Sequence, residues 1–110
     1  MKTFKMKDMV GGWFIGDFEP CALKDKRFEV AYKYHKKDEK WPTHYHKEAT
    51  EINYMISGRM TIQGKLMEEG DIFVLEPYEV ADPVFLEDCY LIVVKTPSVI
   101  GDKYEIRTRD

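Results

Sequence analysis

The stretch that decides the fold is His44-Tyr-His-Lys-Glu-Ala-Thr-Glu-Ile-Asn-Tyr-Met-Ile-Ser-Gly58. It contains two of the chain's three histidines, His44 and His46, with one residue between them. On an extended strand, residues two apart point to the same face, so both imidazoles can reach one ion. Glu51 follows a short polar link and opens an apolar segment, which lets its carboxylate approach from a neighbouring strand. The spacing therefore predicts a site with two histidine ligands and one carboxylate ligand.

This donor set points to a divalent metal without naming it. Two imidazoles and one carboxylate with open coordination positions are associated with non-haem Fe(II), but the same donors also accept Mn, Zn or Ni. Each residue also has an ordinary interpretation. A pair of histidines two apart arises by chance in some chains, and an isolated glutamate is usually a surface residue. We assign no role to the third histidine, His35, and expect it to be exposed at the end of a strand.

The residues around this stretch predict an all-β protein. Short apolar segments of strand length alternate with turn signals, and no segment of ten residues has the apolar spacing of a helix. Helices should therefore be few and short. The first 25 residues are apolar but interrupted by glycine, and we expect extended segments along a sheet edge or across a partner subunit. The predicted strands are 28–35, 52–56, 59–63, 65–67, 72–75 and 89–95.

Alternation along these strands suggests which side chains face inward. On strand 52–56, Asn53 and Met55 share the face of Glu51. On strand 28–35 the large apolar residues fall on one face, which we expect to be the inner one. Core packing is the ordinary role of such residues, and lining of a pocket is the functional alternative. The residues concerned are Phe28, Val30, Tyr32 and Tyr34, together with Trp41 and Tyr45 beside the histidines.

Composition excludes several classes of protein. The chain has 110 residues with 44% hydrophobic and 34% charged side chains, which fits one globular domain. Its longest apolar run, 89–94, is far shorter than the about 20 residues of a membrane span. A net charge of −3 without a basic stripe argues against nucleic acid as a partner. The N-terminus lacks the apolar segment of a secretory signal, and Cys21 and Cys89 have no motif spacing, so we expect free thiols and a cytoplasmic location.

Two motifs give the chain a family resemblance. The pattern His44-x-His46-x4-Glu51-x6-Gly58 resembles the first signature motif of the cupin superfamily, and the segment Gly70 to Pro77 resembles the start of the second. The resemblance covers residues 28–96 and implies an all-β, single-domain cupin-type jelly-roll barrel, that is, a double-stranded β-helix. In this interpretation residues 1–27 form an N-terminal extension with edge strands, and residues 97–110 form a C-terminal segment.

The chain departs from the family pattern at two positions. The glycine that opens the first motif would fall at Asp38. The second motif normally ends in a histidine that completes the metal site, but no histidine follows His46. Counted without gaps, that position is Ala81, and with one inserted residue it is Asp82. Asp82 is therefore a candidate fourth ligand, and a turn residue ahead of Pro83 is the alternative.

The resemblance implies a metal-dependent enzyme that acts on a small polar substrate, as a dioxygenase or as a sugar isomerase or epimerase. The alternatives are a non-catalytic cupin that binds a small ligand, with or without metal, and a barrel with a vestigial site. The sequence does not rank the candidates for a general base, which are Glu48, Tyr54, Tyr78 and Glu79. We also expect a homodimer, because small cupins commonly pair through sheet faces or exchanged N-terminal strands.

Overall fold

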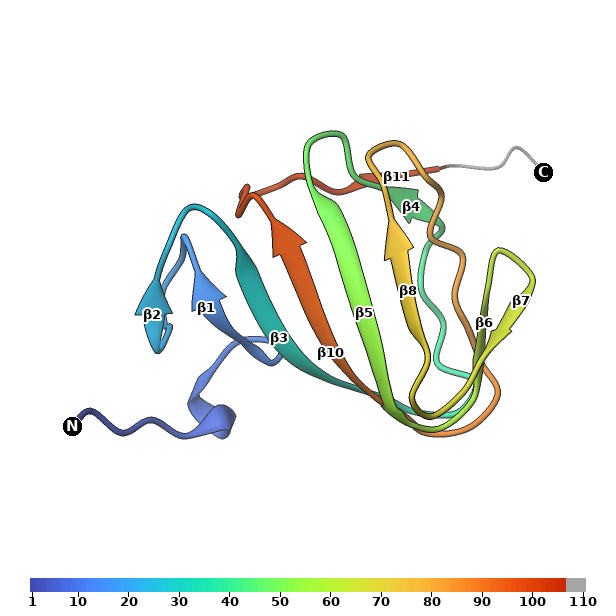
Figure 1. Ribbon diagram of the computed structural model, residues 1–110, viewed down its shortest axis with the longest axis horizontal. Helices are drawn as coiled ribbons and strands as arrows, with labels where there is room; N and C mark the ends of the chain where they lie inside the picture. The colour runs from blue at the N-terminus through green and yellow to red at the C-terminus, as the bar shows by residue number, and fades with distance from the viewer. Residues whose placement is uncertain (107–110) are drawn as a thin grey trace.

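A computed structural model describes residues 1–106, which form two facing layers of β-strands (Figure 1). The larger layer is a six-stranded sheet with the order β2-β1-β3-β10-β5-β8. All its neighbouring strands pair antiparallel except β1 and β2, which are parallel. Its strands are β1 (Trp13–Gly16), β2 (Leu23–Lys24), β3 (Glu29–His35), β5 (Thr50–Ser57), β8 (Ile72–Leu75) and β10 (Cys89–Thr96).

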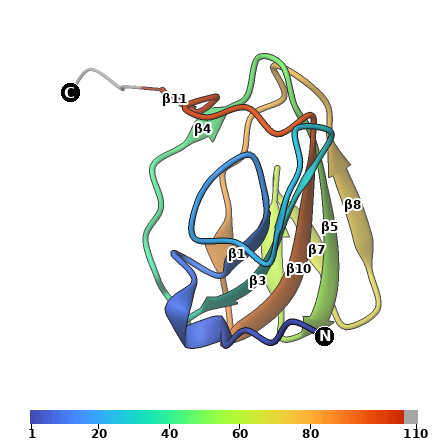
Figure 2. The ribbon, with the colours of Figure 1, turned by 90° about the vertical axis from the view of Figure 1, so that its left-hand side faces the viewer.

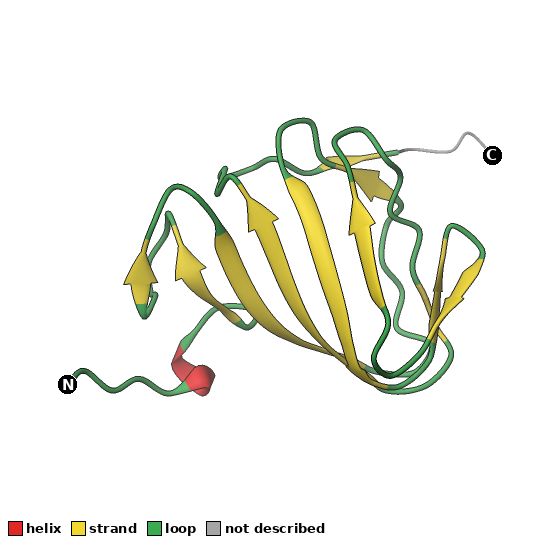
Figure 3. Ribbon diagram, in the orientation of Figure 1, coloured by secondary structure: helices red, strands yellow, loops and turns green. Residues whose placement is uncertain are grey.

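The second layer consists of two small sheets, seen beside the larger one in Figure 2. A three-stranded sheet has the order β7-β6-β9, and a two-stranded sheet pairs β11 with β4. A single 3-10 turn near the N-terminus, Met6–Asp8, is the one helical element in residues 1–106 (Figure 3). In that range, no helix has the length and hydrophobicity needed to cross a membrane. The strands are β4 (His44–Tyr45), β6 (Met60–Ile62), β7 (Lys65–Met67), β9 (Val84–Phe85) and β11 (Tyr104–Glu105).

The predicted all-β architecture is confirmed, and the six predicted strands correspond to β3, β5, β6, β7, β8 and β10. The strands that the sequence did not predict are short and lie near the chain ends or in loops. Four of the five, β2, β4, β9 and β11, have two residues each, too few for alternation to be visible. The fifth, β1, has four residues but is flanked and ended by glycines, which interrupt its apolar pattern. The C-terminal segment was predicted to span 97–110, and its last four residues lie outside the described part of the chain.

The core fills the space between the two layers. From the six-stranded sheet come the inward residues Ala31, Met55 and Leu91, which are almost completely buried. The register explains this layering, because Leu91 pairs with Met55 and Val93 pairs with Ala31 and Asn53 across adjacent strands. Cross-strand partners share a face of the sheet. The small sheets contribute Met60, Ile62 and Phe85 to the same cluster.

One prediction about this sheet is wrong. Tyr32 and Tyr34 were expected to face inward, but they are 38% and 43% exposed on the outer face of β3. The inner face of β3 carries Ala31, Lys33 and His35 instead. The alternation was assigned to the wrong face because the outer face is the more apolar one, and the inner face carries polar side chains that line a cavity.

Candidate functional site

A cavity of about 240 Å³ lies between the two layers. Its deep wall is apolar and belongs to the core, with Phe73, Leu75 and Leu91 among its residues. Its polar side chains come from five separate segments of the chain. They are Lys33, His35, His44, Glu51, Asn53, Lys95 and Lys103.

His46 has one ring nitrogen fixed and the other free. Its Nδ1 lies against the backbone carbonyl of Asp102, which accepts the ring proton. Its Nε2 is buried and has no hydrogen-bond partner among residues 1–106. That atom lies 3.4 Å from Oε1 of Glu51. With the proton on Nδ1, the lone pair of Nε2 therefore faces a carboxylate oxygen.

Glu51 is ionised at this position. The residue lies on the inner face of β5, next to Asn53, whose Nδ2 donates a hydrogen bond of 3.1 Å to Oε2. Burial by itself would raise the pKa of Glu51, but a proton on Nε2 of His46, the charge of Lys95 and the Asn53 bond together outweigh it and lower the pKa to about 2. A lone pair and a carboxylate at this distance repel each other unless a cation lies between them.

His44 has the same orientation of its ring nitrogens. It begins β4, and its backbone exchanges two hydrogen bonds with Ala81, of 3.1 and 2.7 Å. Its Nδ1 lies 3.0 Å from the carbonyl of Pro42, so the proton on this nitrogen has an acceptor and Nε2 is left for a ligand. Burial lowers the pKa of His44 below its usual range, and the ring is therefore neutral at pH 7. Metal-binding histidines characteristically donate their second N–H to a backbone carbonyl in this way.

The side chains of the three predicted ligands lie near one another but do not surround a position that an ion could occupy. Two donor atoms bound to one ion at about 2.1 Å lie about 3 Å apart when their bonds are perpendicular. The separation of 3.4 Å between His46 and Glu51 is close to that value. The ring centres of His44 and His46 are 5.4 Å apart. Within the described range, no three His, Cys, Asp or Glu side chains lie close enough to hold an ion as they stand. The donor types of the three residues, and the fixed Nδ1 atoms of both histidines, therefore fit a metal ion, whereas their present positions do not enclose one.

Asp82, the predicted fourth ligand, is directed elsewhere. Its Oδ1 accepts a hydrogen bond of 2.7 Å from the backbone N–H of Gln63, in the turn between β6 and β7. Ala81 pairs with His44 and lines the cavity, so alternation turns the next side chain away from it. Of the two positions that the count along the chain offered, Ala81 is the one that faces the cavity, and it offers no side-chain ligand. Asp82 has the role of a turn residue.

Asp102 holds the histidine segment in place, and no motif or pattern in the sequence points to it. Its carboxylate accepts hydrogen bonds from the backbone N–H groups of Lys47, Glu48 and Ala49, at 2.8, 3.1 and 2.9 Å. Burial raises the pKa of Asp102, but these three bonds outweigh it, and its pKa is lowered. The same residue accepts the His46 proton through its carbonyl. Asp102 therefore fixes both the turn after His46 and the orientation of its ring.

Sequence reasoning also missed several cavity residues. His35 was expected to be exposed without a role, yet it is half-buried, lines the cavity and lies 2.6 Å from Glu39. Lys33 and Lys95 lie on the inner faces of β3 and β10. Along each strand they alternate with apolar residues of the outer face, and this alternation is the sequence signal that could have placed them. Lys103 lies in the C-terminal segment, where no pattern was visible. The candidates for a general base do not line this cavity. They are Glu48, Tyr54, Tyr78 and Glu79.

No protein-family model and no curated protein match this sequence. Solved structures do match its fold. One is a conserved protein with a double-stranded β-helix domain from Klebsiella pneumoniae, with a TM-score of 0.66, 18% identity, and coverage of 76% of this chain and 73% of that one. An RmlC-like cupin from Ralstonia eutropha has a TM-score of 0.58 and 13% identity, with coverage of 76% and 59%. The polyketide cyclase RemF from Streptomyces resistomycificus has a TM-score of 0.64 and 18% identity, with coverage of 77% and 64%. The two-layered barrel described here is thus the double-stranded β-helix fold of the cupins.

Proposed function

We propose that this protein binds a divalent metal ion at His44, His46 and Glu51 and acts as a metal-dependent enzyme on a small polar molecule in the adjoining cavity. The dioxygenase and the sugar isomerase or epimerase remain the reaction classes that we favour. The metal is Fe, Mn, Zn or Ni. A bound ion of this kind supplies Lewis acidity and open coordination positions.

The observation that carries the proposal is the unpaired Nε2 of His46. A buried polar atom without a partner is costly, and here it faces an ionised carboxylate at 3.4 Å. A cation between the two atoms removes both costs. The proton itself is one such cation, and a metal ion is the other. The neutral His44 beside the pair favours the metal, because it adds a third donor without a charge of its own.

The surrounding residues would have defined roles. Glu51 stays ionised throughout the physiological pH range, and Asn53 holds its second oxygen. Pro42 and Asp102 fix the two ring orientations through their carbonyls. The apolar deep wall keeps water away from one side of a bound molecule. These residues bind and orient, and none of them is assigned here as a general base.

Metal content tests the proposal. After loading with Mn²⁺, Fe²⁺, Ni²⁺ or Zn²⁺ and gel filtration, the wild-type chain is expected to retain about one equivalent of at least one metal, measured by inductively coupled plasma mass spectrometry. His44→Ala and Glu51→Gln should each lower the affinity by at least about 100-fold, because each removes a ligand. The control is His35→Gln, which changes a cavity histidine outside the ligand set and should bind as the wild type does. A wild type that retains none of the four metals would contradict the proposal.

A second candidate is a metal-free binding protein with the same cavity. Lys95 favours it, because its Nζ lies 4.0 Å from Oε1 of Glu51 and already supplies positive charge to the carboxylate. Turnover separates the two candidates. Oxygen consumption with Fe²⁺, or isomerisation of a sugar library with Mn²⁺, supports the enzyme, whereas thermal stabilisation by a ligand without conversion supports the binder. The cyclase among the fold neighbours gives only an analogy in favour of an enzyme.

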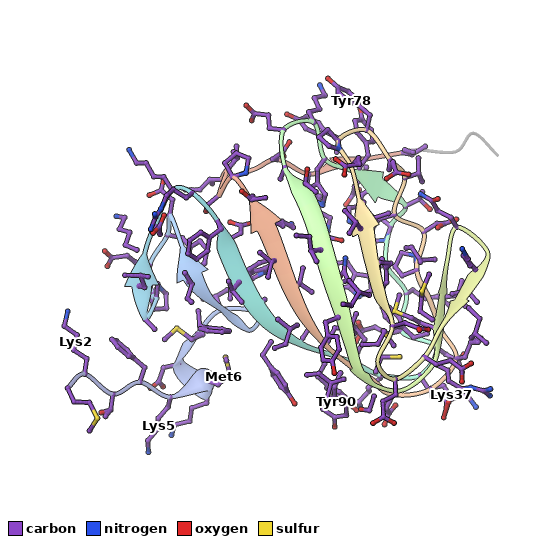
Figure 4. The ribbon with its side chains drawn as sticks, viewed as in Figure 1. Lys2, Lys5, Met6, Lys37, Tyr78 and Tyr90 are labelled. Atoms are coloured by element: carbon purple, nitrogen blue, oxygen red, sulfur yellow. The ribbon has the colours of Figure 1, made fainter. Side chains whose placement is uncertain are left out.

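We also propose that the protein forms a homodimer through the outer face of its large sheet. One row of paired residues crosses four strands of this face and is formed by Tyr32, Ile92, Tyr54 and Ile72. Three of them are exposed, and no charged residue interrupts the row. An uncharged face has no charge pattern to select another partner and matches a copy of itself. The N-terminal arm, on which Lys2 and Lys5 point away from the sheets, offers a second route to pairing (Figure 4).

Tyr54→Glu is expected to convert the dimer to a monomer, because it places a charge in the centre of the apolar row. Analytical ultracentrifugation should show the wild type at twice the chain mass of 13.0 kDa and the variant at the single-chain mass. The control is Leu66→Glu on β7, which lies outside this row and should leave the dimer intact. The two replaced residues are equally exposed, at 43% for Leu66 and 44% for Tyr54. A wild type that sediments as a monomer would refute the dimer.

The free thiols Cys21 and Cys89 fit the cytoplasmic location that we propose for the protein.

A further inference from the structure

Three lysines converge on the mouth of the cavity from separate parts of the chain. Lys33 comes from the inner face of β3, Lys95 from the end of β10 and Lys103 from the segment before β11. Two tryptophans lie among them. The Nζ atoms of Lys33 and Lys95 are 5.2 and 5.0 Å from the ring centre of Trp13. The Nζ of Lys103 is 4.5 Å from that of Trp41. The indole faces therefore hold the ammonium groups beside the opening.

Only one of these lysines is neutralised by carboxylates. Lys95 lies 4.0 Å from an oxygen of Glu29 and 4.0 Å from an oxygen of Glu51. None of the ion pairs in residues 1–106 involves Lys33 or Lys103. Burial lowers the pKa of Lys33 below its usual range, and the charges of Lys95 and Lys103 lower it further. The three ammonium groups are thus close enough to repel one another.

Lys33 and Lys103 therefore lack a carboxylate in direct contact. The carboxylates of Glu39, Glu51 and Glu105 act on these two ammonium groups only from a distance. A divalent ion at the histidines would add further positive charge to the cavity. Charges in a partly enclosed cavity interact more strongly than at an open surface. A negatively charged ligand would reduce the repulsion among the three ammonium groups, both with and without a metal ion at the histidines.

The cavity indicates the size and character of that ligand. Its volume of about 240 Å³ equals that of roughly eight water molecules at about 30 Å³ each. The deep wall is formed by apolar side chains, including Phe73, Leu75 and Leu91. No arginine lines this cavity within the described range, so the planar fork that pairs with phosphate is absent there. A small organic acid with an apolar body suits such a cavity.

We infer that the cavity binds a small carboxylate, with its charge between the ammonium groups of Lys33 and Lys103 and its apolar body against the deep wall. The inference deepens the proposed function and rests on it for the role of the cavity as a ligand pocket. Lys33 and Lys103 are then residues that determine ligand class. Binding of the carboxylate and of a metal ion should be mutually favourable, because the anion and the cation attract each other within the same cavity.

An NMR titration with matched probes tests the inference. The probes are isovalerate, its uncharged counterpart isovaleramide, and inorganic phosphate, each added to the full chain in EDTA and again after loading with Mn²⁺ or Zn²⁺. Isovalerate should shift the amide resonances of cavity residues and bind about tenfold more tightly than isovaleramide. With Zn²⁺, which keeps the spectra sharp, its affinity should rise further. Equal affinity for acid and amide would overturn the inference, and tighter binding of phosphate would overturn the carboxylate assignment.

Lysine variants locate the charge recognition. Lys33→Met keeps the apolar stem and should weaken isovalerate about tenfold, whereas Lys103→Met, at a more exposed residue, should weaken it about fivefold. Lys65→Met on β7 is the matched control and should stay within about twofold of the wild type. Unchanged binding in both cavity variants would overturn the inference. Acid binding by a chain that cannot be loaded with any of the four metals would refute the metal proposal alone, and metal binding without a preference for the acid would refute this inference alone.

Discussion

Replacement of Gly58 by alanine should strongly destabilise the barrel. Gly58 follows β5 with a φ of +94°, and a Cβ built on it would lie 2.3 Å from the carbonyl oxygen of Asp88 and 2.8 Å from Cα of Cys89. Both contacts are to backbone at the start of β10, a strand with hydrogen-bonded neighbours on both sides. The backbone cannot move away without breaking the sheet. We expect a loss of at least about 4 kcal/mol and a fall in Tm of roughly 20 °C.

Gly64→Ala separates the effect of contact from that of conformation. Gly64 also has a positive φ, +72°, but nothing lies within 4 Å of its hypothetical Cβ. The cost there should be the conformational one, about 1 kcal/mol. Urea denaturation of the two variants and the wild type measures both values. Equal losses at the two glycines would show that the close approach at Gly58 does not exist in solution.

Asp102→Ala should damage stability and metal binding together. The substitution leaves three backbone N–H groups without their acceptor, of which that of Ala49 is buried, and we expect a loss of about 1 to 3 kcal/mol in the free energy of unfolding. It also releases the carbonyl that orients His46, so metal affinity should fall about 10- to 100-fold. Glu105→Ala, an exposed acid in the same segment, should change stability by less than about 0.5 kcal/mol. A stable Asp102→Ala chain with unchanged metal affinity would contradict this role.

The pH dependence of stability provides a second measurement on Asp102. Its pKa in the folded chain is lower than in the unfolded chain, so the carboxylate contributes stability above the unfolded value of about 3.9. That contribution is lost as the pH falls through the folded pKa. The free energy of unfolding of the wild type should therefore exceed that of Asp102→Asn at pH 7, and this difference should disappear below about pH 4. A difference between the two chains that stays constant from pH 7 to pH 2 would argue against it.

Much of the fold was visible in the sequence because its long strands carry their own pattern. Strands β3, β5, β8 and β10 alternate over four to eight residues, and Gly58 marks the turn after one of them. The grouping of His44, His46 and Glu51 also followed from spacing, because it needs only a local strand geometry. Local patterns thus predicted the architecture and the proximity of His46 to Glu51.

The remaining features depend on contacts between distant segments. Alternation shows that two faces differ but not which one is buried, and on β3 the apolar face proved to be the outer one. Asp102 and Lys103 reach the site through a tail whose two-residue strand has no pattern of its own. Asp82 was considered as a ligand because a count along the chain cannot tell which of two neighbours faces the cavity. The pairing of Ala81 with His44 decides that question.

The cavity is lined both by the central histidine motif and by residues near the two ends of the chain. This arrangement affects how ligand specificity can change during evolution. Trp13 and Lys103 come from segments outside the signature residues, yet they border the same opening. Mutations in these segments can change the ligand while the barrel and the histidine motif stay intact. Two descendants of one gene could thus keep the same recognisable signature and differ in specificity. Function transferred between them on the strength of that signature alone would then be wrong.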